Sequence, residues 1–124
     1  MKMKFYKCKH CGQIIAMIEP TGVPVICCGE PMEEMVANTQ DASAEKHVPD
    51  YKCEDGKCNV NIGTSDHPMV DEHYIKWIVV ETDKGNYLKV LEPGQKPCKS
   101  FNLCESEKPC NVYAYCNIHG LWKK

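Results

Sequence analysis

The feature that most constrains this chain is the distribution of its cysteines and histidines. Four cysteines lie near the N-terminus: Cys8, Cys11, Cys27 and Cys28. Four of the five histidines follow later, together with one more cysteine: His47, His67, His73, Cys116 and His119. Four sulfurs match the ligand count of a tetrahedral thiolate site, whereas four imidazoles and one thiolate leave one octahedral position of a first-row metal open. The sequence therefore predicts two metal centres of different purpose.

The composition narrows the class of protein. The chain has ten cysteines, but its opening sequence MKMKFYKCKH lacks the apolar core and cleavage site of an export signal. We therefore expect a cytoplasmic protein whose cysteines are metal ligands and spare thiols rather than a disulfide framework. The net charge of −2 and the absence of a long Lys/Arg run argue against a nucleic-acid partner, and no apolar stretch is long enough to span a membrane.

The sequence predicts two domains joined by a polar linker. Residues 1–36 carry the first cysteine group on short apolar runs separated by glycine and proline, and bury too little apolar surface to fold without a metal. Residues 37–44 (ANTQDASA) are small and polar, as in a linker. Residues 45–124 contain six or seven short strands and no helical period of useful length, which predicts an all-β chain ending in a β-sandwich.

Turn residues place the predicted hairpins of the sandwich. Asp55-Gly56 and Asp83-Lys84-Gly85 each separate two strand-like runs, and Asp-Gly is a strong two-residue hairpin signal. A strand is expected to open at His73, another covers residues 110–116, and the segment 101–104 (FNLC) is a further candidate.

The first cysteine group favours iron over a structural zinc ribbon. Cys8-Lys-His-Cys11 is a tight turn in which His10 is expected to be an exposed side chain. Cys27 and Cys28 are adjacent, so both can reach one ion only if the backbone turns there, with Gly29 and Pro31 supplying the turn. Zinc ribbons normally have a spaced second pair, whereas sulfur-ligated iron with no open position performs one-electron transfer.

The second ligand group is expected at strand ends and in loops at one end of the sandwich. His67 is held extended by Pro68, and residues 117–120 must form a turn if Cys116 and His119 are to meet. Any one of these histidines alone would be read as a solvated loop residue. Four of them, with a thiol three residues before the last, indicate a site.

Three segments of the second domain carry a resemblance to a known family: residues 45–49 (EKHVP), residues 67–78 (HPM through HYIKWI) and residues 116–122 (CNIHGLW). They resemble the two-iron superoxide reductases, also called desulfoferrodoxins, and residues 27–32 (CCGEPM) are similar to the desulforedoxin-like domain of that family. The resemblance implies a small desulforedoxin-like (rubredoxin-like) iron domain followed by an immunoglobulin-like, neelaredoxin-like β-sandwich. It also implies four equatorial imidazoles and an axial Cys116 thiolate around the second iron.

The same resemblance implies a reaction, the one-electron reduction of superoxide to hydrogen peroxide, with a rubredoxin-like electron donor and a homodimeric protein. Lys46 is then expected to steer superoxide and organise a proton-donating water, and Glu45 to occupy the sixth position of the oxidised iron. For both to reach the metal, this stretch would have to be a mobile loop. The alternative is a solvated Glu-Lys pair.

The sequence also allows two other functions. The protein could be a non-catalytic iron protein that only carries electrons, or a zinc-stabilised binding module. Five cysteines lie outside both ligand groups: Cys53, Cys58, Cys98, Cys104 and Cys110. Cys53 and Cys58 face each other at the non-hydrogen-bonded position next to the Asp55-Gly56 turn, where a disulfide can form on oxidation. The other three are expected to be spare thiols or a further disulfide rather than a third metal site.

Overall fold

The structure, a computed structural model, describes residues 3–124; residues 1 and 2 of the predicted first domain lie outside this range. The described chain forms two compact units that divide between Val36 and Ala37. The prediction of an all-β protein is confirmed, with one short helix, α1 (Ala44–His47), as the exception.

The N-terminal unit is a small three-stranded sheet together with a hairpin. The sheet has the order β2-β1-β5, with β1 (Lys4–Lys7), β2 (Ile14–Met17) and β5 (Glu33–Glu34). The hairpin pairs β3 (Ile26–Cys27) with β4 (Glu30–Pro31). Phe5 and Met32 are buried apolar side chains of this unit. So small a core agrees with the expectation that this unit needs a bound metal to fold.

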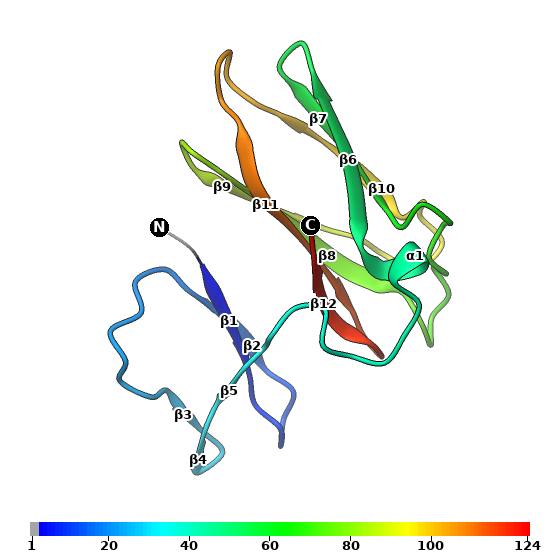
Figure 1. Ribbon diagram of the computed structural model, residues 1–124. Helices are drawn as coiled ribbons and strands as arrows, with labels where there is room; N and C mark the ends of the chain where they lie inside the picture. The colour runs from blue at the N-terminus through cyan, green and yellow to red at the C-terminus, as the bar shows by residue number, and fades with distance from the viewer. Residues whose placement is uncertain (1–2) are drawn as a thin grey trace. The chain divides into compact units, whose positions relative to one another are not determined.

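The second unit is a sandwich of two antiparallel sheets (Figure 1). One sheet has the order β10-β7-β6, formed by β6 (Pro49–Glu54), β7 (Lys57–Ile62) and β10 (Cys98–Asn102). The other has the order β12-β11-β8-β9, formed by β8 (Ile75–Thr82), β9 (Asn86–Val90), β11 (Pro109–Cys116) and β12 (Gly120–Lys123).

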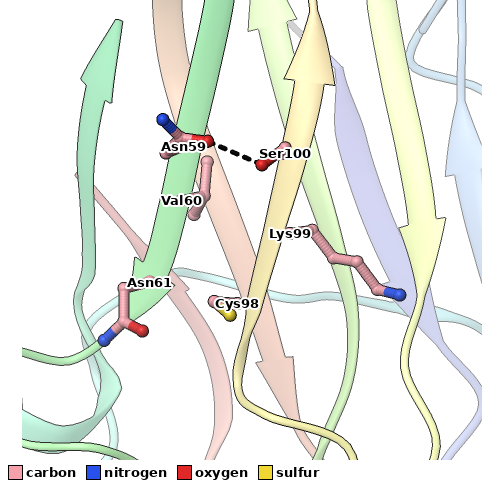
Figure 2. Close-up of a pocket in the computed structure, with 6 residues that line it drawn as sticks. All are labelled: Asn59, Val60, Asn61, Cys98, Lys99 and Ser100. Atoms are coloured by element: carbon pink, nitrogen blue, oxygen red, sulfur yellow. Dashed lines mark hydrogen bonds between the residues drawn. The ribbon is translucent and has the colours of Figure 1, made fainter.

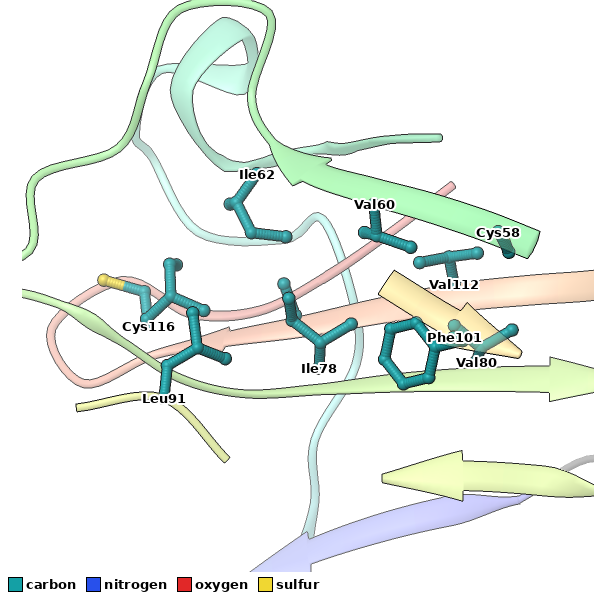
Figure 3. Packing of buried hydrophobic residues seen from close by; sticks show 11 residues of the cluster. Cys58, Val60, Ile62, Ile78, Val80, Leu91, Phe101, Val112 and Cys116 are labelled. Carbon is teal, nitrogen blue, oxygen red and sulfur yellow. The ribbon is translucent and has the colours of Figure 1, made fainter. Parts of the chain in front are cut away.

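The core of the sandwich is built from alternate residues of both sheets. Val60 and Ile62 of β7 meet Ile78 of β8 and Val112 of β11, and all are at most 1% exposed. Figure 3 shows Cys116 near one end of this cluster and Cys58 near the other. The two sulfurs therefore belong to opposite ends of one apolar core.

Most predicted turns are confirmed. The Asp55-Gly56 hairpin joins β6 and β7, and residues 83–85 join β8 and β9. The strand expected at His73 instead begins at Ile75, because His73 forms an isolated bridge with Val70 in the preceding loop. The candidate strand at residues 101–104 is the end of β10, which stops at Asn102. The short β12 was not predicted.

The segment before the first histidine ligand corrects an expectation. The stretch that carries Glu45 and Lys46 is expected to be a mobile loop if both side chains are to reach the metal. It instead lies in one helical turn, α1, in which the Val48 N–H donates to the Ala44 carbonyl at 2.9 Å. Part of the expected linker packs on the second unit, since the Asn38 amide donates to the Lys123 carbonyl at 3.0 Å. No helix within residues 3–124 is long and apolar enough to cross a membrane.

Candidate metal centres

The four predicted sulfur ligands come together in the N-terminal unit. The Sγ atoms of Cys8, Cys11, Cys27 and Cys28 all lie within 4.8 Å of one another. Cys8 and Cys11 flank a turn closed by the Gly12 N–H, which donates to the Cys8 carbonyl at 2.9 Å. Cys28 and Gly29 are the two turn residues of the β3–β4 hairpin, with φ of +53° and +78°, typical of a type I′ turn. The expected backbone turn is thus made by Cys28 and Gly29, while Pro31 lies in β4.

The electrostatics of this cysteine group fit a bound cation. The Cys11 backbone N–H lowers the pKa of Cys8 to about 6, and hydrogen bonding with the Cys11 side chain raises the pKa of Cys27 to about 12. One thiolate is therefore favoured and a second is opposed, because two like charges would lie in contact. A metal ion removes that opposition and can hold all four sulfurs as thiolates. His10 is exposed, and its Nε2 lies 3.2 Å from the Glu30 carboxylate. It is therefore not one of the clustered ligands, as expected.

The second group gathers at the Cys116 end of the sandwich. Nitrogen atoms of His47, His67 and His73 and the Cys116 sulfur all lie within 4.8 Å of one another. His47 comes from α1, His67 and His73 from the loop before β8, and Cys116 from the last position of β11. The fifth predicted ligand, His119, lies beside them, with Nδ1 3.0 Å from His47 Nε2 and 4.0 Å from Cys116 Sγ.

The imidazole tautomers leave lone pairs facing one another. His47 Nδ1 donates to the Ser43 carbonyl at 2.6 Å, and His67 Nδ1 donates to the Pro68 carbonyl at 2.7 Å. Burial lowers the pKa of His67 to about 4 and also lowers the pKa of His47, so both rings are neutral at pH 7. Their Nε2 atoms, 3.2 Å apart, then carry no proton to share.

His73 supplies a second sign that this group binds a cation. Its Nε2 is buried and has no hydrogen-bond partner among the described residues. A buried polar nitrogen without a partner is costly, and two facing lone pairs repel. One metal ion bound between the Nε2 atoms of His47, His67 and His73 would give each of these three nitrogens a partner. The donor set therefore fits a resident metal.

Cys116 and His119 are brought together by a tight turn. β11 ends at Cys116, β12 begins at Gly120, and these two residues are paired, so the expected turn between them is confirmed. The His119 N–H donates to Cys116 Sγ at 3.4 Å. Burial raises the pKa of the Cys116 thiol, while backbone N–H groups of the turn oppose that rise. A bound cation would complete the stabilisation of a buried thiolate here.

Two residues of the same segment hold the ligands in place, a role that sequence reasoning missed. The Asn117 amide donates to the Glu72 carbonyl and accepts from the Tyr74 N–H, both at 3.0 Å, so it grips the backbone on either side of His73. The Trp122 ring stacks on His47 with centroids 4.9 Å apart and its Nε1–H donates to the His119 carbonyl at 3.1 Å. The polar side-chain groups of Asn117 and Trp122, inside the motif at residues 116–122, were the signal in the sequence that could have predicted this role.

Glu45 and Lys46 lie next to the second group but are not among its clustered ligand atoms. Both side chains are exposed. The Glu45 carbonyl accepts a hydrogen bond from the Ser65 N–H at 3.1 Å. Gly63 permits this contact, because a Cβ there would lie 2.6 Å from the Glu45 carbonyl oxygen. The turn that carries both residues is therefore tethered at its backbone while their side chains face solvent.

Comparison with known proteins supports a single family over both units. Residues 1–35 match the family model of the desulfoferrodoxin N-terminal domain, and residues 39–124 match the desulfoferrodoxin model. The desulfoferrodoxin of Desulfarculus baarsii is 41% identical over 122 residues, which cover 98% of this chain and 95% of the relative. A desulfoferrodoxin homolog of Archaeoglobus fulgidus is 40% identical over 121 residues, covering 98% and 95%.

A solved structure matches over the same extent. The crystal structure of the superoxide reductase from Treponema pallidum aligns with a TM-score of 0.84 and 31% sequence identity, covering 100% of this chain and 99% of that one. The expected resemblance is thereby confirmed in sequence and in fold, and this chain belongs to the desulfoferrodoxin family.

Proposed function

We propose that this protein is a superoxide reductase with one iron at each of its two metal centres. The observation that carries the proposal is the convergence of neutral imidazole nitrogens and the Cys116 sulfur, with the partnerless His73 Nε2 among them. Iron bound there would supply the single electron that superoxide needs to become hydrogen peroxide, with two protons taken up from water. The family and the fold of the Treponema pallidum enzyme support this reading.

Each side chain has a proposed task. His47, His67, His73 and His119 hold the metal by imidazole nitrogens, and Cys116 holds it by sulfur. Neutral imidazoles leave the cation's charge compensated only by the Cys116 thiolate, so the site stays positive and favours the approach of a small anion. Lys46 adds an exposed positive charge beside this group and would orient a proton-donating water. Glu45 would close the open position after oxidation, for which the helical turn of α1 would have to open.

The proposed division of labour follows the two units. Residues 1–36 would form the four-cysteine iron domain and residues 45–124 the catalytic domain, with residues 37–44 joining them. A rubredoxin-like electron donor, a homodimer and a cytoplasmic location remain predictions.

The anion-steering role of Lys46 is tested by charge removal with a matched control. Lys46→Ala should slow the reaction with superoxide by about two- to tenfold at low ionic strength and flatten its salt dependence. Lys57→Ala makes the same charge change at the hairpin beside Cys58, at the opposite end of the core, and should leave the rate unaltered. Pulse-radiolysis rates across a salt series measure both. Equal rates and salt slopes for the two variants would remove Lys46 from the mechanism.

Glu45 is tested by spectroscopy. Glu45→Ala should leave turnover largely intact and change the visible spectrum of the oxidised protein; an unchanged spectrum would reject it as a ligand.

The visible spectrum with and without azide or cyanide also separates the competing functions. A reductase with an open position should change its spectrum when a small anion binds. A pure electron carrier should not respond, and a zinc-stabilised binding module should be colourless.

A further inference from the structure

Cys58, which belongs to neither metal group, lies at the end of the core opposite Cys116 (Figure 3). Cys53 of β6 and Cys58 of β7 face each other in the hairpin register, with Cα atoms 4.0 Å apart, and the structure records a disulfide between them. The Asp55-Gly56 turn, with φ of +52° and +77°, holds this register. The pairing expected from the turn is thus present.

The two sulfurs differ in accessibility. Cys58 is 0% exposed and belongs to the apolar core cluster. Cys53 is exposed and lines a hollow of about 320 Å³ between the hairpin tip and residues 103–109. A reagent from solvent therefore meets Cys53 rather than the buried Cys58.

The hairpin does not depend on the disulfide for its position. β7 pairs with β10 on its other side from Lys57 to Asn61, and the Leu103 N–H donates to the Gly56 carbonyl at 2.8 Å beyond the end of that ladder. The disulfide encloses only residues 54–57, so it removes little freedom from the unfolded chain compared with a long loop. The sulfur pair can change its redox state while the sandwich stays folded.

We propose that Cys53 and Cys58 form a peroxide-oxidised thiol site, with Cys53 as the attacking thiol and Cys58 as the resolving thiol. The Cys53 thiolate attacks one oxygen of hydrogen peroxide; an S–O bond forms, the O–O bond breaks, and hydroxide leaves and is protonated to water. The Cys58 sulfur then attacks Cys53 Sγ, an S–S bond forms, and the sulfenic oxygen leaves as water. In sum, two thiols lose two electrons and two protons, and one peroxide becomes two waters. The choice of hydrogen peroxide as oxidant rests on the proposed function, of which it is the product.

The burial of Cys58 is expected to slow the reduction that resets the site. A dithiol reductant can attack only the exposed Cys53 sulfur, which expels the Cys58 sulfur as a thiolate inside an apolar core. That leaving group is costly, so reduction is expected to be slow but complete. The disulfide would then persist after an episode of peroxide formation.

Cys98 provides a matched control on the same sheet. It is an exposed free thiol of β10 in a separate hollow of about 390 Å³ that residues of β7 and β10 line (Figure 2). Its cross-strand neighbour is Asn61, so no second sulfur stands opposite to resolve a sulfenic acid.

The test maps thiols in the full-length, metal-loaded protein. The protein is reduced with dithiothreitol, desalted without oxygen, treated with one equivalent of hydrogen peroxide, alkylated and analysed by peptide mass spectrometry. The Cys53–Cys58 cross-link should accumulate before Cys98 is modified. Cys53→Ser should abolish the cross-link, Cys98→Ser should leave its rate unchanged, and Cys58→Ser should leave a dimedone-reactive sulfenic acid on Cys53.

Two results would overturn the proposal. One is oxidation of Cys98, Cys104 or Cys110 at the same rate as Cys53. The other is a cross-link that excess dithiothreitol never reduces in the folded protein, which would make it a permanent structural bond. Because peroxide is added from outside, neither result depends on superoxide reduction, and a protein without reductase activity can still pass the test.

Discussion

Asn117 offers the sharpest test of how this fold holds its second metal centre. Its amide makes two hydrogen bonds, to the Glu72 carbonyl and from the Tyr74 N–H, and so ties the backbone on both sides of His73 to the turn after Cys116. Asn117→Ala removes both. At about 0.5–1.5 kcal/mol for each bond, the loss is about 1–3 kcal/mol. Residues that orient metal ligands typically cost about 10- to 100-fold in metal affinity when removed, which is the effect expected here.

The assay is an anaerobic chelator competition that follows metal loss from each centre. The four-cysteine centre of the same chain is an internal control and should keep its affinity. Asn111→Ala is a matched variant, since Asn111 donates to the Glu81 carboxylate at 2.6 Å near the other end of β11, and it should spare both centres. If Asn117→Ala lowers the unfolding free energy of the metal-free protein yet leaves the metal affinity within twofold, the argument that Asn117 positions His73 is refuted.

Two further predictions concern Gly63 and His67. Gly63→Ala places a Cβ 2.6 Å from the Glu45 carbonyl oxygen at a φ of +82°. The substitution should therefore lower the unfolding free energy by about 1–3 kcal/mol in urea titrations. A loss below about 0.5 kcal/mol would contradict the close packing of α1 against Gly63. In the metal-free protein, burial lowers the pKa of His67 from the unfolded value of 6.5 to about 4. The neutral ring of His67 therefore contributes its full stability above pH 6.5, and this stability is lost as the pH falls toward 4. By pH 5 the loss should be about 2 kcal/mol. His67→Asn should remove that part of the pH dependence, and identical slopes for both proteins would count against it.

The chemistry of the ligands was readable from the sequence because it depends on residue type and spacing. The adjacent Cys27-Cys28 pair required a backbone turn, and the Asp55-Gly56 dipeptide required a hairpin, since few local conformations satisfy either. That hairpin register in turn placed Cys53 opposite Cys58 before any tertiary contact was considered. Local geometry was sufficient in each case.

The arrangement around the ligands was decided only by tertiary contacts. The turn at residues 44–47 is held by a distant segment, since the Glu45 carbonyl accepts from the N–H of Ser65, twenty positions later in the chain. Asn117 hydrogen-bonds to the backbone of residues 72 and 74, and the Trp122 ring packs on His47. The pattern of polar and apolar residues in the sequence predicts neither contact. Residue spacing thus determined which atoms could bind a metal. Packing between distant segments determined the tautomer, burial and direction of each, because those properties depend on neighbours that only the folded chain supplies.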